Sequence, residues 1–65
     1  MHKDIRKIIK VAETQGFEVI RTRRGHYMVW LDGEYVTTLP GTPSDWRSLR
    51  NAIAAMRRFG FRWPP

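Results

Sequence analysis

The 65-residue chain contains no cysteine, only two histidines, and no apolar run close to the ~20 residues of a membrane-spanning helix. Without cysteine it has neither a disulfide framework nor a thiolate nucleophile, and His2 and His26 are too far apart to resemble a spaced zinc motif. The N-terminal stretch MHKDIRKIIK is too charged for the core of a signal peptide. We therefore expect one cytoplasmic domain, residues 1–65, that is stabilised by apolar packing and uses no membrane, metal or cofactor.

Acidic residues are also few, with six Asp and Glu against twelve Lys and Arg, which gives a formal net charge of +6. This basic excess favours a polyanionic partner such as nucleic acid. It is also compatible with solubility alone or with attraction to an acidic protein, because net charge reports on association and not on fold. Aromatic residues make up 12% of the chain and suit either a small core or base stacking.

The first segment after the N-terminus has the periodicity of an amphipathic helix. Its apolar residues recur at i, i+3, i+4 and i+7, which predicts a helix over residues 4–15. Gly16 is suited to the left-handed conformation that ends a helix, so that Phe17 folds back onto the last turn. The residues predicted to be buried are Ile5, Ile8, Ile9 and Ala12.

A second helix is predicted near the C-terminus, over residues 43–59, with a tail over 60–65. Thr42 is suited to be its N-cap, Pro43 its first residue, and Asp45 occupies a position like that of a capping box. The predicted buried stripe consists of Trp46, Leu49, Ala52, Ile53 and Met56.

Between the helices the apolar period changes to two, which predicts strands over residues 17–23, 26–31 and 34–39. Asp32 and Gly33 join the last two strands as a two-residue hairpin, because both loop positions of such a turn need a positive φ. The predicted cross-strand pairs are Leu31 with Glu34, Val29 with Val36, Tyr27 with Thr38, Trp30 with Tyr35, Met28 with Thr37 and His26 with Leu39.

The α-β-β-β-α order predicts an α+β fold, a double-stranded-RNA-binding-domain-like sandwich whose three-stranded antiparallel sheet carries both helices on one face. We expect the inward residues of the hairpin to be Tyr27, Val29, Leu31 and Val36. The outward ones are then His26, Met28, Trp30 and Tyr35, although a bulge near Gly25 would exchange the two faces locally.

The order of short motifs along the chain resembles the HicA family, also described as YcfA-like, of small toxins from bacteria and phages. The likeness covers nearly all of residues 3–61. It consists of a basic first helix ending in QGF, an Arg-Gly-His entry to the second strand, a glycine turn, a strand ending in LP, and a last helix followed by an aromatic residue, glycine and another apolar residue. The resemblance implies an mRNA interferase, a metal-independent endoribonuclease that is paired with an acidic HicB-like antitoxin.

Family members usually carry Gly-Ser-His at the entry to the second strand, often followed by another histidine, and the first histidine is catalytic. Here the stretch reads RGHY. The resemblance therefore gives His26 the catalytic position, while Arg24 and Gly25 replace Gly-Ser and Tyr27 replaces the second histidine.

Cleavage of RNA without a metal requires a base for the ribose 2′-OH, a proton donor for the leaving 5′-oxygen, and cations that stabilise the charged phosphorane. Histidine is the only side chain whose unperturbed pKa suits either proton transfer near neutral pH, so we assign that role to His26. Arginine binds phosphate through two hydrogen bonds at once. The residues expected to bind RNA are Arg21, Arg23, Arg24, Gly25, Tyr27, Arg47 and Arg50.

Each of these assignments has a structural alternative. His26 is equally compatible with a strand-edge role, and the arginines of the second helix with a solvated face. Trp30 and Tyr35 are expected to stack on bases only if they are exposed, and partial burial or a partner surface is the more common role. The alternative functions are a non-catalytic RNA- or DNA-binding module and a basic partner of an acidic protein.

Overall fold

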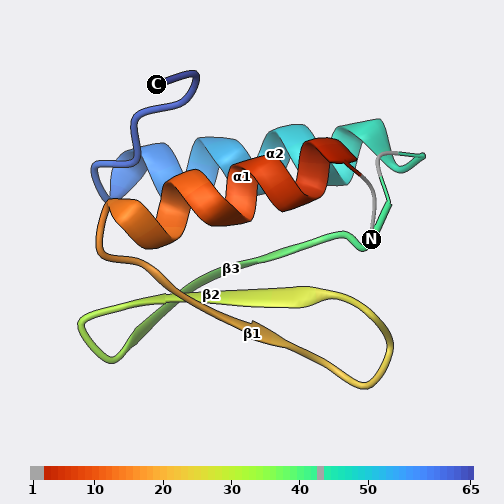
Figure 1. Ribbon diagram of the computed structural model, residues 1–65, viewed down its shortest axis with the longest axis horizontal. Coiled ribbons are helices and arrows are strands. Elements are labelled where there is room, and N and C mark those ends of the chain that lie inside the picture. The colour runs from red at the N-terminus through yellow and green to blue at the C-terminus, as the bar shows by residue number, and fades with distance from the viewer. Residues whose placement is uncertain (1–2, 43) are drawn as a thin grey trace.

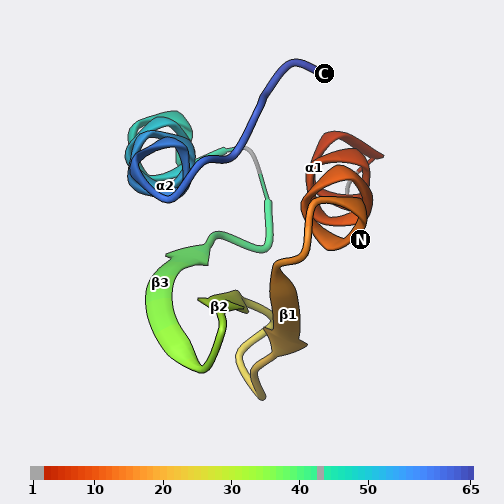
Figure 2. The same ribbon diagram turned by 90° about the vertical axis from the view of Figure 1, so that its left-hand side faces the viewer.

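The structure, a computed structural model, describes residues 3–42 and 44–65. Its elements are α1 (Lys3–Thr14), β1 (Glu18–Arg21), β2 (Tyr27–Leu31), β3 (Glu34–Leu39) and α2 (Trp46–Arg58). The strands form one antiparallel sheet in the order β1-β2-β3. Both helices lie side by side over one face of this sheet, and the other face is left uncovered (Figures 1 and 2). The predicted α-β-β-β-α sandwich is confirmed.

The two helices end in the same way, at a glycine followed by phenylalanine. Gly16 and Gly60 have φ of 96° and 94°, a conformation that favours glycine because it has no side chain to clash. The amide of the next residue, Phe17 or Phe61, donates a hydrogen bond of 3.1 Å back to the last turn of its helix. The two phenylalanine rings therefore meet edge to face, with centroids 5.6 Å apart.

The core lies between the helices and the covered face of the sheet. The apolar stripes of both helices and alternate residues of the strands point into this space. The buried apolar residues of the described chain are Ile5, Ile8, Ala12, Phe17, Tyr27, Val29, Leu39, Leu49, Ala52, Met56 and Phe61. Leu31 and Val36 are partly buried against this core, so the predicted inward face of the hairpin is confirmed.

The hairpin between β2 and β3 begins as predicted and then changes register. Asp32 and Gly33 have φ of 51° and 79°, as a two-residue loop requires. The pairs Leu31–Glu34 and Trp30–Tyr35 are confirmed, but a bulge follows between Val29 and Trp30. The observed pairs beyond it are Val29 with Thr37, Met28 with Thr38 and Tyr27 with Leu39. The predicted pairs Val29–Val36, Met28–Thr37, Tyr27–Thr38 and His26–Leu39 are wrong because β3 carries one extra residue at the bulge.

The start of α2 differs from the prediction. Asp45, and not Thr42, is the N-cap, because its carboxylate accepts hydrogen bonds from the Ser48 amide at 3.1 Å and the Ser48 hydroxyl at 2.6 Å. The Thr42 hydroxyl is paired with Ser44 instead, at 2.6 Å. Pro43, the predicted first helical residue, lies outside the described residues. Trp46 is 60% exposed, so its predicted place in the core is wrong.

The predicted first strand is also too long. β1 ends at Arg21, because Thr22 already takes part in the turn that leads to β2. The predicted helix boundaries at residues 4 and 15 differ from α1 by one residue at each end, which is within the fraying of helix ends.

The C-terminal segment, residues 61–65, is fastened to both helices. The Gln15 side chain donates to the Arg62 carbonyl at 2.9 Å and accepts from the Arg62 amide at 2.8 Å. The Arg57 guanidinium donates to the Trp63 carbonyl, and the Trp63 ring is stacked on Phe61, with centroids 6.1 Å apart and planes 8° apart. In Figure 2 this segment passes between α1 and α2 and rises away from the sheet.

Candidate nucleic-acid interface

The turn between β1 and β2, residues 22–26, is closed by Thr22. The Thr22 amide donates to the His26 carbonyl at 2.8 Å, and the Thr22 hydroxyl accepts from the His26 amide at 3.1 Å. The Gly25 amide donates to the Thr22 carbonyl at 3.1 Å, and Gly25 has a φ of 81°. These three hydrogen bonds fix the backbone of His26 at the entry to β2 without using its imidazole.

The side chain of His26 is exposed, as predicted for the outer face. Within the described residues, its ring makes no hydrogen bond or ion pair. Arg23 and Arg24 of the turn are exposed as well, so the turn presents one imidazole and two guanidinium groups to solvent, and Arg21, the exposed last residue of β1, precedes it. These four predicted site residues share one short segment of the chain, but Arg21 is the cross-strand partner of Tyr27 and therefore lies on the Tyr27 face of the sheet.

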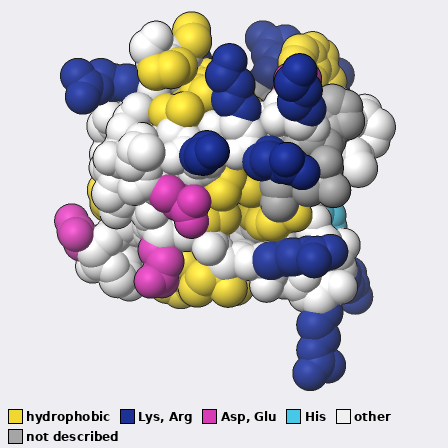
Figure 3. All heavy atoms as spheres, in the orientation of Figure 1, with side chains coloured by type: hydrophobic (Ala, Val, Ile, Leu, Met, Phe, Trp, Pro, Cys, Tyr) yellow, Lys and Arg dark blue, Asp and Glu magenta, His cyan; other side chains and the backbone are white. Residues whose placement is uncertain are grey.

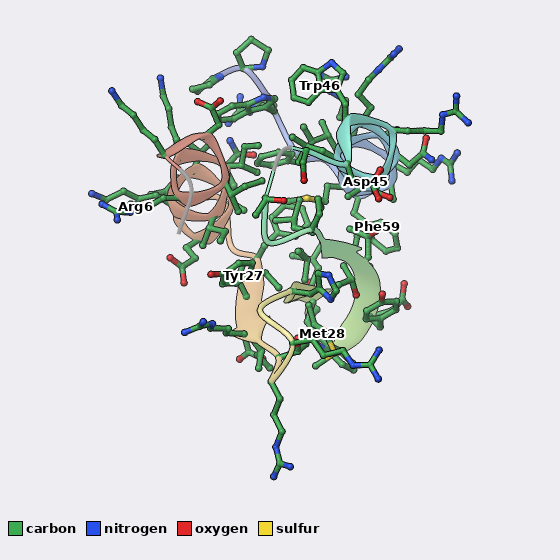
Figure 4. The ribbon with its side chains drawn as sticks, turned by 90° about the vertical axis from the view of Figure 1, so that its right-hand side faces the viewer. Arg6, Tyr27, Met28, Asp45, Trp46 and Phe59 are labelled. Atoms are coloured by element: carbon green, nitrogen blue, oxygen red, sulfur yellow. The ribbon has the colours of Figure 1, made fainter. Side chains whose placement is uncertain are left out.

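Tyr27 does not share this surface. It is only 7% exposed, and its ring points toward α1 from the covered face of the sheet (Figure 4). Alternation along a strand sends adjacent side chains to opposite faces, which separates Tyr27 from its neighbour His26. The polar end of Tyr27 is therefore placed at the edge of the core and not beside the imidazole.

The turn packs against the segment that follows β3. Pro40 is buried, and a Cβ atom added to Gly41 would collide with the carbonyl oxygen of Gly25. Only glycine at position 41 allows the two backbones to approach so closely. This contact holds the turn at the end of the molecule where α1 and α2 both begin, which we call the turn end (Figure 1).

Arg47 and Arg50 are exposed on α2, on a helix face that does not touch the sheet. They line a shallow groove of about 930 Å³ between α2 and the C-terminal segment, which we call the α2 groove. Its lining residues are Trp46, Arg47, Arg50, Asn51, Ile53, Ala54, Arg57, Trp63 and Pro64. Sequence reasoning connected the arginines with RNA but missed the groove, because it placed Trp46 in the core.

The angular position of Trp46 could have revealed its role. At about 100° per residue, Trp46 lies within roughly 40° of Arg50 and Arg57 around the helix axis, and farther from the centre of the buried stripe. The fold places it above α2 on the side of the C-terminal segment, whereas Phe59 lies on the opposite edge of the helix, next to β3 (Figure 4).

Acidic side chains are gathered at the other end of the molecule. This end, which we call the hairpin end, holds the last turns of α1 and α2, the start of β1 and the β2–β3 turn (Figure 1). Its carboxylates are Glu13, Glu18, Asp32 and Glu34. Figure 3 shows acidic side chains toward the lower left, and basic ones over α1 and around the lower right, where the β1–β2 turn lies.

Asp45 is an acidic residue directly before Trp46 of the α2 groove, and its carboxylate caps the N-terminus of α2. The hydrogen bonds from the side chain and backbone of Ser48 hold the pKa of the Asp45 carboxyl below its ordinary value of 3.8. Its charge is therefore already directed at the helix N-terminus, where it complements the helix dipole.

The uncovered face of the sheet carries an aromatic pair. The rings of Trp30 and Tyr35 meet edge to face, with centroids 5.5 Å apart, and Tyr35 is 48% exposed. The Tyr35 hydroxyl is paired with Thr38 at 2.6 Å, whereas the buried Trp30 Nε1 has no hydrogen-bond partner in the described chain. The rings are therefore engaged mainly with each other.

No group of three or more His, Cys, Asp or Glu side chains in residues 3–42 and 44–65 is placed to hold a metal ion. Neither described helix has the length and apolar character needed to cross a membrane. Comparison with known proteins gives no family: no family model, curated protein or solved structure matches the chain.

Proposed function

We propose that this protein binds single-stranded RNA and cleaves it as a HicA-like mRNA interferase, with His26 as the proton-transfer group. One observation carries the proposal: the exposed imidazole of His26 stands in a hydrogen-bonded turn with two exposed arginines, Arg23 and Arg24. The net charge of +6 supports a polyanionic substrate.

The chemistry requires only groups that this turn offers. The ribose 2′-oxygen attacks the adjacent phosphorus as its proton passes to the base, and the bond from phosphorus to the 5′-oxygen breaks. The products are a 2′,3′-cyclic phosphate and a 5′-hydroxyl, which receives a proton from the imidazolium or from water. Arg23 and Arg24 stabilise the extra negative charge on the phosphorane, because guanidinium groups pair with phosphate through parallel hydrogen bonds.

The proposal extends to a partner. A basic surface that binds RNA also attracts an acidic protein, and a HicB-like antitoxin that covers the turn end would keep His26 from its substrate. The resemblance of the sequence to HicA toxins motivates this part of the proposal.

Cleavage of a labelled single-stranded RNA by the purified protein in the presence of a chelator tests the enzyme. One positioned acid or base contributes about 10²- to 10⁴-fold, so His26→Ala should lower the rate by a factor in that range. His2→Ala, which removes the other histidine, should leave the rate unchanged. Equal cleavage by the wild type and His26→Ala would overturn the assignment, and so would an intact substrate with both proteins.

A second function, a non-catalytic RNA-binding module, is favoured by the burial of Tyr27. This burial takes the hydroxyl of Tyr27 away from His26, so the next residue along the chain supplies no proton donor. A non-catalytic module should bind RNA with a salt-dependent affinity and release it uncut. The same cleavage assay separates the two functions.

A further inference from the structure

We propose that the α2 groove is a binding site for unpaired bases of single-stranded RNA, in which Trp46 stacks on a base while Arg47 and Arg50 hold the neighbouring phosphates. This inference rests on the RNA-binding part of the proposed function and does not depend on cleavage. The proposed ligand of the groove is single-stranded RNA, and the proposed role of Trp46 is to stack on a base. The His26 turn has no such role.

The backbone of Trp46 is held in position although its side chain is exposed. Trp46 is the first residue of α2, directly after the cap, and the two hydrogen bonds between Asp45 and Ser48 fix the backbone on both sides of it. Trp46 is 60% exposed, so most of its large apolar surface stays in contact with water and does not contribute to the stability of the fold. A tryptophan on a fixed helix backbone has only two side-chain torsions to order, so it offers a base a flat face at a low cost in conformational entropy.

The C-terminal segment makes the second wall of the groove. Trp63 cannot swing freely, because its ring is stacked on Phe61 and its carbonyl accepts a hydrogen bond from Arg57. Ile53 and Ala54 line the apolar part of the groove, between the tryptophans and the arginines. From Trp46 to Arg57 the groove follows about 16 Å of helix, at 1.5 Å per residue.

The positive charge of the residues that line the groove favours a single strand of nucleic acid as its ligand. The groove is lined by three arginines, Arg47, Arg50 and Arg57, and by no carboxylate. An aromatic ring set among cations matches the alternation of base and phosphate along a single strand. A duplex does not fit this description, because its base faces are stacked on one another and cannot reach the indole.

The first test measures binding of a fluorescently labelled 2′-O-methyl oligouridine of about 16 nucleotides, a length within the range of single-strand binding sites. This RNA has no free 2′-OH, so the proposed cleavage cannot interfere. Trp46→Ala should weaken binding by roughly 5- to 100-fold, and Trp46→Phe, which keeps a ring, should weaken it less. Phe59→Ala removes an exposed aromatic ring from the other edge of the same helix and should leave binding unchanged.

The second test varies salt. Removing a phosphate contact to a single strand lowers the slope of log K against log salt by about 0.7, so Arg47→Ala and Arg50→Ala should each lower it by that amount. Arg58→Ala, an equal loss of charge on α2 outside the groove, should leave the slope unchanged.

Equal affinities of Trp46→Ala and Phe59→Ala would overturn the inference, and so would equal binding of a duplex of the same length. Displacement of the oligonucleotide by polyglutamate at the same concentration of charge would assign the groove to an acidic protein instead. The same experiments distinguish a failure of this inference from a failure of the proposed function. Trp46-dependent binding with no cleavage of ordinary RNA refutes the nuclease alone, and His26-dependent cleavage with Trp46-independent binding refutes the groove alone.

Discussion

At the scale of single residues, the position of His26 depends on two neighbours that carry no charge. Thr22 closes the turn through its amide and its hydroxyl, and Gly41 lets the turn lie directly against the segment after β3. Neither residue has chemistry of its own to offer RNA. Their role is to hold the backbone that carries the imidazole and the arginines.

Substitution of Gly41 by alanine tests this contact. The added methyl group must push the Gly25 carbonyl away, and overpacking of this kind costs about 1–3 kcal/mol of the free energy of unfolding. We expect a loss of that size in urea unfolding, together with slower RNA cleavage. Thr42→Ala, at the next position, removes an exposed hydroxyl with its hydrogen bond to Ser44 and should lower the stability less than Gly41→Ala. A fully stable Gly41→Ala protein would contradict the close approach of the two backbones.

Asp45 makes the start of α2 sensitive to acid. Hydrogen bonds from Ser48 lower the pKa of Asp45 in the folded protein, so the carboxylate stabilises the fold at pH values above its ordinary value of 3.8. This contribution is lost as the pH falls through the lower pKa of the folded state. Asp45→Ala should therefore unfold at a lower temperature than the wild type at pH 7, and the difference should shrink below pH 3.8.

Asp45→Asn is the matched control, because asparagine is a good N-cap without a titrating group. It should retain most of the stability at pH 7 that Asp45→Ala loses. A difference between the wild type and Asp45→Ala that is the same at pH 7 and at strongly acidic pH would refute the capping role of the charge.

At the scale of elements, the C-terminal segment connects the ends of the two helices. Gln15, just after α1, forms two hydrogen bonds with the backbone of Arg62, and the phenylalanines that follow the two helices meet in the core. The segment is thus a structural part of the sandwich, and it also forms one wall of the α2 groove.

Gln15→Ala should loosen this wall. Two hydrogen bonds at a partly exposed site contribute roughly 1–2 kcal/mol, so we expect a loss of that order in urea unfolding and faster hydrogen exchange of the Arg62 amide. Binding of oligouridine should weaken as well, because the groove opens. Thr14→Ala, an exposed change one residue earlier, should not affect the Arg62 amide. Unchanged exchange at Arg62 in Gln15→Ala would show that the side chain does not hold the segment.

Local signals in the sequence were sufficient to predict most of the helices, strands and turns. Gly16 ends α1 and Asp32-Gly33 makes the hairpin turn as predicted, because the conformations of these positions are set by backbone sterics alone. The bulge in β3 was not predictable in this way. The stretch EYVTTL has two adjacent apolar and two adjacent polar residues, which does not say where β3 takes an extra residue, because this depends on how the strand pairs with β2.

The candidate site was predictable to a similar degree. The exposure of His26 agrees with its predicted outward position, but the turn itself is longer than predicted, because Thr22, Arg23 and His26 were placed in strands. Trp46 was missed because the apolar stripe of α2 extrapolates to it, while the competing caps Thr42 and Asp45 leave the start of the helix undetermined by sequence. The groove itself depends on how the C-terminal segment packs against α2, and the hydrophobic periodicity of the sequence does not predict this packing.

At the scale of the whole molecule, charge is distributed unevenly. The hairpin end carries four carboxylates as well as Arg57 and Arg58 at the end of α2, whereas basic side chains predominate at the turn end (Figure 3). Such a polarity orients an approaching polyanion before any contact is made. It places the His26 turn and the start of the α2 groove on the side that RNA meets first, and the β2–β3 turn on the side that repels it.

Titration of the ¹⁵N-labelled protein with 2′-O-methyl oligouridine, followed by NMR, tests this account most directly, because it reports on every backbone amide at once. We expect the largest shifts at Arg23, Arg24 and His26 and at the indole Nε1 of Trp46, and none at Asp32 to Glu34 in the hairpin turn. Shifts confined to the hairpin end, or an absence of shifts at both His26 and Trp46 while the oligonucleotide binds, would contradict the account.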